Sequence, residues 1–382
     1  MTERPAATLD FGALEQPLSP LFRDYLAGAG AAPTFFDGGR FDVAATLAAS
    51  GRPDPFPGLR AKVSQVLAKQ QRARGAPDSA RNAERLAEPT SAAIVTGQQA
   101  GLFGGPLFVL WKALGAILLA RDLQARRGAP VVPVFWVASD DHDFAEIRSA
   151  CLLDEAGALR TVRYAPAQEP SGQPASRIVL DASIAALVEE ARALAKPGLH
   201  RDGVLDRLAA AYEPGQTMSS AFARLLSSLF PELVILDPSD PELKALMVPL
   251  LAREIREGSP TSRLALEAGQ RLLAAGYHQQ VPVRPGFLNL FMVMEGERRA
   301  LGFQDGSLEV RGTRHRLSVE EAVRALETSP AEWSPGALLR PIVQDALLPT
   351  AAYVGGPAEI AYHAQIVPSY AHFGVPRPVL LP

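Results

Sequence analysis

Short apolar runs and helical patterns alternate through the middle of the chain. Residues 91–97, SAAIVTG, form an apolar run that ends in glycine, a pattern typical of a strand. Residues 106–128 repeat apolar side chains at three- and four-residue spacing, which predicts a helix with Pro106 at its first position and Gly128 at its end. The predicted buried stripe of this helix consists of Leu107, Leu110, Trp111, Leu114, Ile117 and Leu118. Residues 130–139, PVVPVFWVAS, are apolar at odd and even positions alike, as expected for a parallel strand covered on both faces.

Strand, glycine-rich loop, helix and strand in this order form the crossover unit of a doubly wound sheet. The pattern returns at residues 221–255 and in the last fifty residues. We therefore predict an α/β fold, with a mostly parallel sheet and helices on both faces. Two stretches break the rhythm and are expected to be insertions, residues 152–215 and the β-rich residues 276–330. The core would then be assembled from residues 1–151, 216–275 and 331–382.

The first candidate site is the loop TGQQAGLFGGP, residues 96–106. Glycines let the backbone approach a ligand closely, and a following helix start favours an anion. The paired glutamines can both donate to and accept from a polar substrate. The loop lacks the Gly-Lys-Ser/Thr of a Walker loop and the dinucleotide fingerprint, so a tight turn with solvated glutamines remains the alternative. The candidate ligand-binding residues here are Gly97, Gln98, Gln99, Gly101, Gly104 and Gly105.

The second candidate is the run Asp140, Asp141, His142 and Asp143 directly after the second predicted strand. Ligands of open α/β sheets bind beyond the carboxyl ends of the strands, where these acids would lie. Crowded carboxylates raise one another's proton affinity, which suits a general acid or base, and we take Asp141, His142 and Asp143 as candidate catalytic residues. The alternatives are a helix cap by Asp140 or Asp141 and a divalent metal site. Successive side chains alternate in direction, so all four cannot face one ion, and we expect no resident metal.

The third candidate is YVGGPAEIAYH, residues 353–363, which repeats the Gly-Gly-Pro pattern of the first loop. Two helix starts at one sheet edge could hold an anionic substrate from two sides. Tyr353, Gly355, Gly356 and Glu359 are the candidate binding residues, although Glu359 also suits the first turn of a helix for structural reasons alone. We read LLRPIV, residues 338–343, as a strand, which would place Gln344 and Asp345 at a carboxyl end as well.

Composition limits the class of protein. The net charge of −3 over 382 residues gives no general attraction to nucleic acid or anionic membranes. The one cysteine excludes an intrachain disulfide and a cysteine zinc site, and it fits a reducing compartment. The first twenty residues have no signal-peptide pattern, and no uncharged run suits a membrane span, so we expect a cytoplasmic protein.

Several long motifs, in this order along the chain, resemble the bacillithiol biosynthesis cysteine-adding enzymes. They include VTGQQAGLFGGPLF, PVFWVASDDHDFAEI, LDPSDPELK, PTSRL, NLFMVMEGERRAL and LRPIVQDALLPTAAYVGGPAEIAY. The resemblance runs from residue 18 to the last residue. It implies a Rossmann-like core with connecting-peptide insertions. It also implies a ligase that joins L-cysteine to the amino group of glucosaminyl-malate, the last step to the thiol bacillithiol.

In that family a coiled coil linked to homodimerisation and to a nucleotide site follows the point where this sequence stops. Amide formation needs an activated carboxyl group, so we expect ATP and Mg²⁺ as co-substrate. Asp141, His142 and Asp143 would supply the base, the glutamine loop would orient the substrate, and the helix start after Gly356 would hold the malate carboxylates. The alternatives are a nucleotide- or sugar-binding module without catalysis, and a metal-dependent hydrolase or nucleotidyltransferase.

Overall fold

A parallel five-stranded sheet forms the centre of the computed structural model, which describes residues 18–36, 42–52, 55–56 and 58–382. Part of the predicted first core segment, including residues 1–17, lies outside these residues. The strand order is β12-β11-β1-β2-β5, and every pairing is parallel. The strands are β1 (Ala92–Gln98), β2 (Val131–Val137), β5 (Val234–Leu236), β11 (Thr350–Val354) and β12 (Val379–Leu381). The chain proceeds from β1 to β2 and β5 on one side and returns as β11 and β12 on the other. The order therefore reverses between β1 and β11, the place where open sheets of this kind bind ligands.

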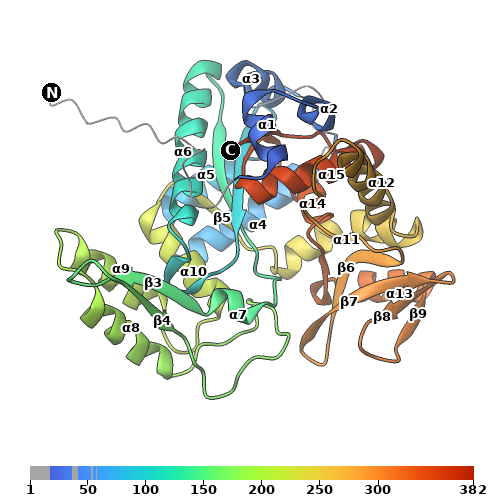
Figure 1. Cartoon of the computed structure of the whole chain (residues 1–382). Coiled ribbons are helices and arrows are strands. Elements are labelled where there is room, and N and C mark those ends of the chain that lie inside the picture. The colour runs from blue at the N-terminus through green and yellow to red at the C-terminus, as the bar shows by residue number, and fades with distance from the viewer. Residues whose placement is uncertain (1–17, 37–41, 53–54, 57) are drawn as a thin grey trace.

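Helices cover both faces of this sheet, as predicted (Figure 1). Alternate residues of β2 divide between the two cores: Val134 and Trp136 face one side, and Phe135 and Val137 the other. The first side is packed by α1 (Pro20–Ala27), α4 (Leu59–Ala73), α11 (Pro241–Arg256), α12 (Pro260–Ala274), α14 (Arg340–Leu347) and α15 (Pro357–Phe373). The other is packed by α3 (Val43–Ser50), α6 (Phe108–Arg127) and α10 (Met218–Leu229). The short helices are α2 (Ala32–Phe35), α5 (Pro77–Arg85) and the 3₁₀ turn η2 (Leu102–Gly104).

The predicted stripe of α6 is wrong at most of its positions. Leu107, Trp111, Leu114 and Leu118 are exposed, and Trp111 keeps 63% of its surface accessible. The buried face instead combines three alanines with larger side chains. It consists of Val109, Lys112, Ala113, Ala116, Ile117, Leu119, Ala120 and Leu123. Alanines let a helix pack closely on a sheet, so the apolar periodicity did not identify the buried face. Pro106 also lies two residues before the helix, which begins at Phe108.

Two additional structures interrupt the core, and Figure 1 places them at its lower left and lower right. One consists of α7 (Phe144–Ile147), the hairpin β3 (Ser149–Leu153) and β4 (Leu159–Arg163), and the helices α8 (Ser183–Leu194) and α9 (Arg201–Ala211). The other is an antiparallel sheet in the order β10-β6-β7-β8-β9. Its elements are β6 (Phe287–Met294), β7 (Glu297–Gln304), β8 (Ser307–Val310), β9 (Arg316–Ser318), α13 (Val319–Thr328), η3 (Pro330–Glu332) and β10 (Trp333–Pro335). We call the structure of α7, β3, β4, α8 and α9 the first insertion, and the antiparallel sheet with α13 and η3 the second insertion.

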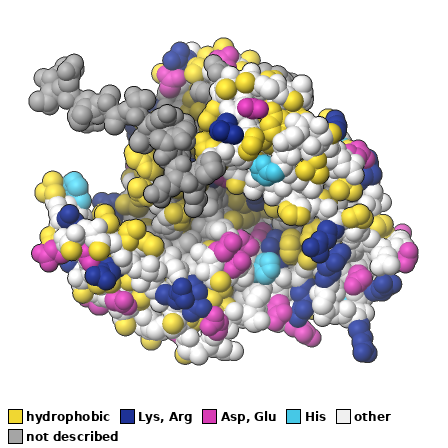
Figure 2. Space-filling model, in the orientation of Figure 1, with side chains coloured by type: hydrophobic (Ala, Val, Ile, Leu, Met, Phe, Trp, Pro, Cys, Tyr) yellow, Lys and Arg dark blue, Asp and Glu magenta, His cyan; other side chains and the backbone are white. Residues whose placement is uncertain are grey.

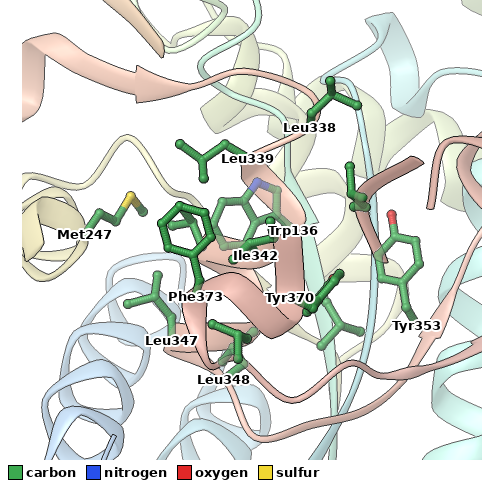
Figure 3. Packing of buried hydrophobic residues seen from close by; sticks show 14 of the residues in the cluster. Trp136, Met247, Leu338, Leu339, Ile342, Leu347, Leu348, Tyr353, Tyr370 and Phe373 are labelled. Atoms are coloured by element: carbon green, nitrogen blue, oxygen red, sulfur yellow. The ribbon is translucent and has the colours of Figure 1, made fainter. Parts of the chain in front are cut away.

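The strand predicted at residues 338–343 is wrong, because residues 338–339 form a turn and the helix α14 begins at Arg340. Leu338, Leu339, Ile342, Val343 and Leu347 are buried, and their spacing is that of one helical face. Figure 3 shows Leu339 and Ile342 beside Trp136 of β2 and Phe373 of α15. The apolar run was too short for its period to be recognised. None of the helices in the described ranges is long and apolar enough to cross a membrane.

Candidate functional site

A cleft lies at the carboxyl ends of β1, β2 and β11, where the strand order reverses. It consists of two adjoining cavities that share Trp136, Ala138, Ala337 and Arg340. The first cavity, of about 440 Å³, is lined by residues from the ends of β1 and β11, including Gln98, Gln99, Phe108, Gly356, Glu359 and Tyr362. The second, of about 320 Å³, adds Asp140, Asp141, His142, Phe291 and Arg298. Figure 2 shows a hollow near the middle of this face, with acidic and histidine side chains below it. The three predicted loops therefore meet at one cleft.

Gln99 connects the first loop to the acidic run. Its side-chain amide donates hydrogen bonds to Asp141 Oδ2 and to Glu146 Oε2, both at 2.6 Å. Gln98 accepts a hydrogen bond of 3.1 Å from the ammonium of Lys112. Gly97 is required at the end of β1 because a Cβ there would lie 2.6 Å from the carbonyl oxygen of Trp136. Both glutamines thus line the first cavity in positions fixed by charged partners.

The glycine turn after the glutamines does not have the predicted free N–H groups. Gly101 N donates to the Gln99 carbonyl, Gly104 N to Gly101 and to the Tyr212 hydroxyl, and Gly105 N to Leu102. The Tyr212 hydroxyl in turn donates to the Gly101 carbonyl at 3.0 Å. These three groups therefore offer no phosphate cradle. The glycines close a compact turn against the first insertion, and neither cavity includes Gly101, Gly104 or Gly105 among its lining residues.

Glu359 lines the first cavity, and the buried Lys112 pairs with it from behind that wall. Lys112 is 3% exposed, and its ammonium donates to the Gly97 carbonyl at 2.6 Å and pairs with Glu359. Burial lowers the pKa of Lys112, and the carboxylate of Glu359 opposes that shift. Glu359 also accepts hydrogen bonds from the buried Tyr353 hydroxyl and from Gly356 N. One lysine therefore ties the end of β1 to the start of α15.

The start of α15 is consequently a poor site for an external anion. The N–H of Gly356 already donates to Glu359 Oε2 at 2.8 Å, as in a capping box. Gly356 lies close to the tip of the Phe108 ring, because a Cβ there would be 2.4 Å from it and Phe108 would have to shift. The structural reading of Glu359 as a helix cap thus holds. The helix start predicted to bind the malate carboxylates is occupied by the carboxylate of Glu359.

The four residues of the acidic run point to different partners. Asp140 pairs with the fully buried Lys244, whose ammonium lies 2.7 Å from both carboxylate oxygens. Asp141 accepts from Gln99 and from the backbone N–H of His142. Asp143 is exposed, lines neither cavity, and caps α7 by accepting from Glu146 N at 3.2 Å. The helix cap considered for Asp140 or Asp141 is therefore formed by Asp143, while Asp140, Asp141 and His142 line the second cavity.

His142 lies against an arginine of the second insertion. A guanidinium nitrogen of Arg298 is 3.3 Å from His142 Nδ1, so Nδ1 accepts and Nε2 carries the ring hydrogen. Burial lowers the pKa of His142, and the positive charge of Arg298 lowers it further, while Asp141 and Asp143 oppose the shift. His142 is thus a neutral imidazole at pH 7. Nothing in the sequence pattern identified Arg298, because it reaches the cleft from a strand 156 residues away.

Gln344 and Asp345 lie on α14 and not beyond a strand end. Gln344 is fully buried and accepts a hydrogen bond of 2.9 Å from Arg340, which lines both cavities. Asp345 is also buried, where the Tyr370 hydroxyl donates to it at 2.6 Å and burial raises its pKa to about 6. Neither residue lines the cleft. Gln344 acts on the cleft only through Arg340.

His363 follows Tyr362 on α15 and packs among aromatic rings. It stacks on Tyr362 with ring centroids 5.1 Å apart, and Tyr353 lies on another side. Neither ring nitrogen has a hydrogen-bond partner, and burial lowers the pKa of His363 to about 3. It is a packed histidine. Among the described residues, no three histidine, cysteine, aspartate or glutamate side chains converge to hold a metal ion.

The fold and the cleft define a Rossmann-like α/β protein with a polar ligand site at the point where its strand order reverses. The chain belongs to the BshC family. The family model described as "Bacillithiol biosynthesis BshC, N-terminal Rossmann-like domain" matches residues 9–382.

Several relatives carry the name "Putative cysteine ligase BshC", among them those of Salinibacter ruber, Koribacter versatilis and Chlorobaculum tepidum. The protein of Salinibacter ruber is 36% identical over 366 residues, which are 95% of this chain and 66% of the relative. That of Koribacter versatilis is 38% identical over 349 residues, 90% of this chain and 64% of the relative. That of Chlorobaculum tepidum is 38% identical over 333 residues, 84% of this chain and 58% of the relative. The chain thus spans less than two thirds of the length of these relatives.

Proposed function

We propose that this protein is a cytoplasmic ligase that forms an amide between the carboxyl group of L-cysteine and the amino group of glucosaminyl-malate. This would be the last step of bacillithiol biosynthesis. Support comes from the family and from the names of the relatives. The observation that carries the proposal is the meeting of Gln98–Gln99, Asp140–His142 and Glu359 at one cleft beside the strand reversal.

Amide formation requires a neutral amine and an activated carboxyl group. A nucleoside triphosphate co-substrate with Mg²⁺ would supply the activation. Asp141 is the proposed base for the sugar ammonium, because it lines the second cavity and Gln99 fixes its carboxylate. His142 is neutral, and its Nε2–H is the proposed donor to the oxygen that gains negative charge. The amide of Gln98, held by Lys112, would orient the substrate in the first cavity.

The walls of the first cavity suit a sugar ring. Phe108, Trp136 and Tyr362 present aromatic surface, and glutamine and glutamate side chains supply polar groups. Aromatic walls with few placed polar groups are the usual lining of small-molecule sites. Lys112 and Tyr353 are positioning residues in this proposal, because each holds the carboxylate of Glu359 in place at the wall of the first cavity.

The test is incubation of the purified chain with glucosaminyl-malate, L-cysteine and ATP-Mg²⁺. Product is detected by thiol labelling and mass spectrometry, with a full-length relative as control. Bacillithiol formed by both proteins would support the proposal. Product from the relative alone, with substrate still bound by this chain, would favour a binding module without catalysis. Hydrolysis of a substrate that stops on chelation and returns with added metal would favour the metal-dependent alternative.

A further inference from the structure

Two arginines in the cleft have no acidic partner. Arg340 of α14 lines both cavities, and Arg298 of β7 lines the second. Within the described residues, no ion pair joins either guanidinium to a carboxylate, although Asp140 and Asp141 act on Arg298, and Glu359 acts on Arg340, over a longer distance. The cleft therefore contains two positive charges that the protein itself does not pair.

Neutral groups hold both guanidiniums in place. Arg298 donates to Ser334 Oγ at 2.9 Å and to the Pro335 carbonyl at 3.1 Å, and it stacks 3.7 Å from the centre of the Phe291 ring. Arg340 donates to Gln344 and to the Tyr362 hydroxyl at 2.9 and 2.8 Å. These contacts fix the orientation of each side chain without neutralising its charge. Such preorganised guanidiniums suit a carboxylate, which can accept two parallel hydrogen bonds from one arginine.

The other cations beside the cleft are already neutralised. Lys112 is paired with Glu359 and Lys244 with Asp140. The start of α15 is occupied by Glu359 as well. A half-buried charge without a partner is costly, so two such charges facing one cavity indicate a ligand that brings negative charge. The two arginines are therefore the remaining cationic side chains on the described walls of the second cavity.

We propose that Arg298 and Arg340 bind the two carboxylates of a malate-type dicarboxylate and so select substrates that carry one. The choice of malate rests on the proposed function, whereas the demand for a dianion rests on the two unpaired guanidiniums. The aromatic side of the first cavity would then receive the sugar. Arg340 lies between the part of the cleft that would receive the sugar and the part that would receive the dicarboxylate, because it lines both cavities. Arg298 belongs to the second insertion, so that insertion would contribute substrate selection to the core.

The test is binding of L-malate to the full chain by titration calorimetry, without cysteine or nucleotide. L-Lactate is the matched probe, because it keeps the hydroxyl and one carboxylate. Arg298→Gln and Arg340→Gln each remove a guanidinium, and Arg298→Lys retains the charge but not the planar fork. Arg263→Gln is the control, since Arg263 is exposed on α12 and pairs with Glu267 outside the cleft. Thermal unfolding of each variant establishes that it is folded.

We expect L-malate to bind about tenfold or more tightly than L-lactate, and each cleft variant to weaken malate binding at least about tenfold, with Arg298→Lys between. Arg263→Gln should bind malate as the unaltered chain does. Absence of malate binding at millimolar concentration, equal binding of malate and lactate, or unchanged malate binding in both folded cleft variants would overturn the inference. Malate binding without ligation would overturn the proposed function and leave the inference standing. If the chain carries out ligation but the arginine variants bind malate with unchanged affinity, the proposed function would stand and the inference would be overturned.

Discussion

The ammonium of Lys244 lies 2.7 Å from both carboxylate oxygens of Asp140, with the lysine fully buried. The same nitrogen donates to the carbonyl of Trp333 at 2.9 Å. One side chain of α11 thus joins the loop after β2 to the first residue of β10. Burial lowers the pKa of Lys244, and the charge of Asp140 opposes this. The pair fixes the second insertion against the core at the second cavity.

Replacing Lys244 with Met should destabilise the protein by about 3–5 kcal/mol, because Asp140 would lose its partner in a poorly solvated site. The double variant Lys244→Met, Asp140→Asn should recover part of that loss, since it buries no unpaired charge. Urea unfolding of the four proteins in the cycle measures both effects. Additive losses in the double variant would show that the pair does not act as a unit.

The structure separates two aspartates that the sequence pattern treated alike. Asp141→Asn should reduce amide formation by about 100-fold or more, because it removes the proposed base while keeping the size of the side chain. Asp143→Asn should have little effect, because asparagine also caps helices and Asp143 lines neither cavity. Initial rates with saturating substrates measure the difference. Equal rates for the two variants would refute the assignment of the base to Asp141.

His363→Phe should stabilise the protein at acidic pH. The pKa of His363 is about 3 in the folded protein and its ordinary value is 6.5, so the unfolded chain binds a proton first. Above pH 6.5 the low pKa of His363 therefore costs the protein no stability. As the pH falls from 6.5 toward 3, protonation of the unfolded chain lowers the free energy of unfolding. At pH 5 this effect lowers the free energy of unfolding by about 2 kcal/mol. The His363→Phe variant has no titrating group at this position and does not show the effect.

Unfolding free energies of both proteins at pH 5 and pH 8 provide the measurement. The advantage of the phenylalanine variant should grow on acidification. His315→Phe, at an exposed position, is the control and should show no such trend. A pH-independent difference for His363→Phe would mean that the histidine is protonated as easily in the folded protein as in the unfolded one.

Glu254 should have the opposite pH dependence. It is fully buried, caps the start of α12 by accepting from Thr261 and Ser259, and burial raises its pKa to about 7. Because the folded protein holds this proton more tightly than the unfolded chain, stability is lost as the pH rises from about 4.5 to 7. Glu254→Gln keeps an acceptor oxygen and does not titrate. The free energy of unfolding of Glu254→Gln, relative to that of the unaltered protein, should therefore rise by about 2–3 kcal/mol between pH 5 and pH 8. Glu267→Gln, at an exposed position on α12, should show no such gain in the same unfolding measurement.

The sheet and its loops could be predicted because they depend on local sequence. β1 and β2 are continuous apolar runs, and the glycines beside them mark the chain reversals. The strand predicted before Gln344 failed because a run of six residues, apolar except for Arg340, fits the period of a strand or of a helix, and packing against Trp136 and Phe373 favoured the helix. The stripe on α6 failed because the packed face includes three alanines, which carry little hydrophobic signal.

The candidate site was predicted at the level of loops but not of individual contacts. Gln98, Gln99, Asp141, His142 and Glu359 were identified because they follow strand ends. Their partners could not be identified, since Lys112 meets Glu359 across 247 residues and Lys244 meets Asp140 across 104. A lysine within a helical pattern looks like any solvated residue. Only the tertiary fold distinguishes these two from the exposed lysines.

The unequal burial of the three tryptophans gives the protein an internal optical probe. Trp111 is 63% exposed on α6, whereas Trp136 and Trp333 are 2% and 1% exposed. A water-soluble quencher such as iodide should therefore suppress the emission of Trp111 and leave that of the other two. Trp136 lines both cavities, and the carbonyl of Trp333 accepts from Lys244. The fluorescence that survives quenching would thus report on the cleft and on the contact between the core and the second insertion, without any added label.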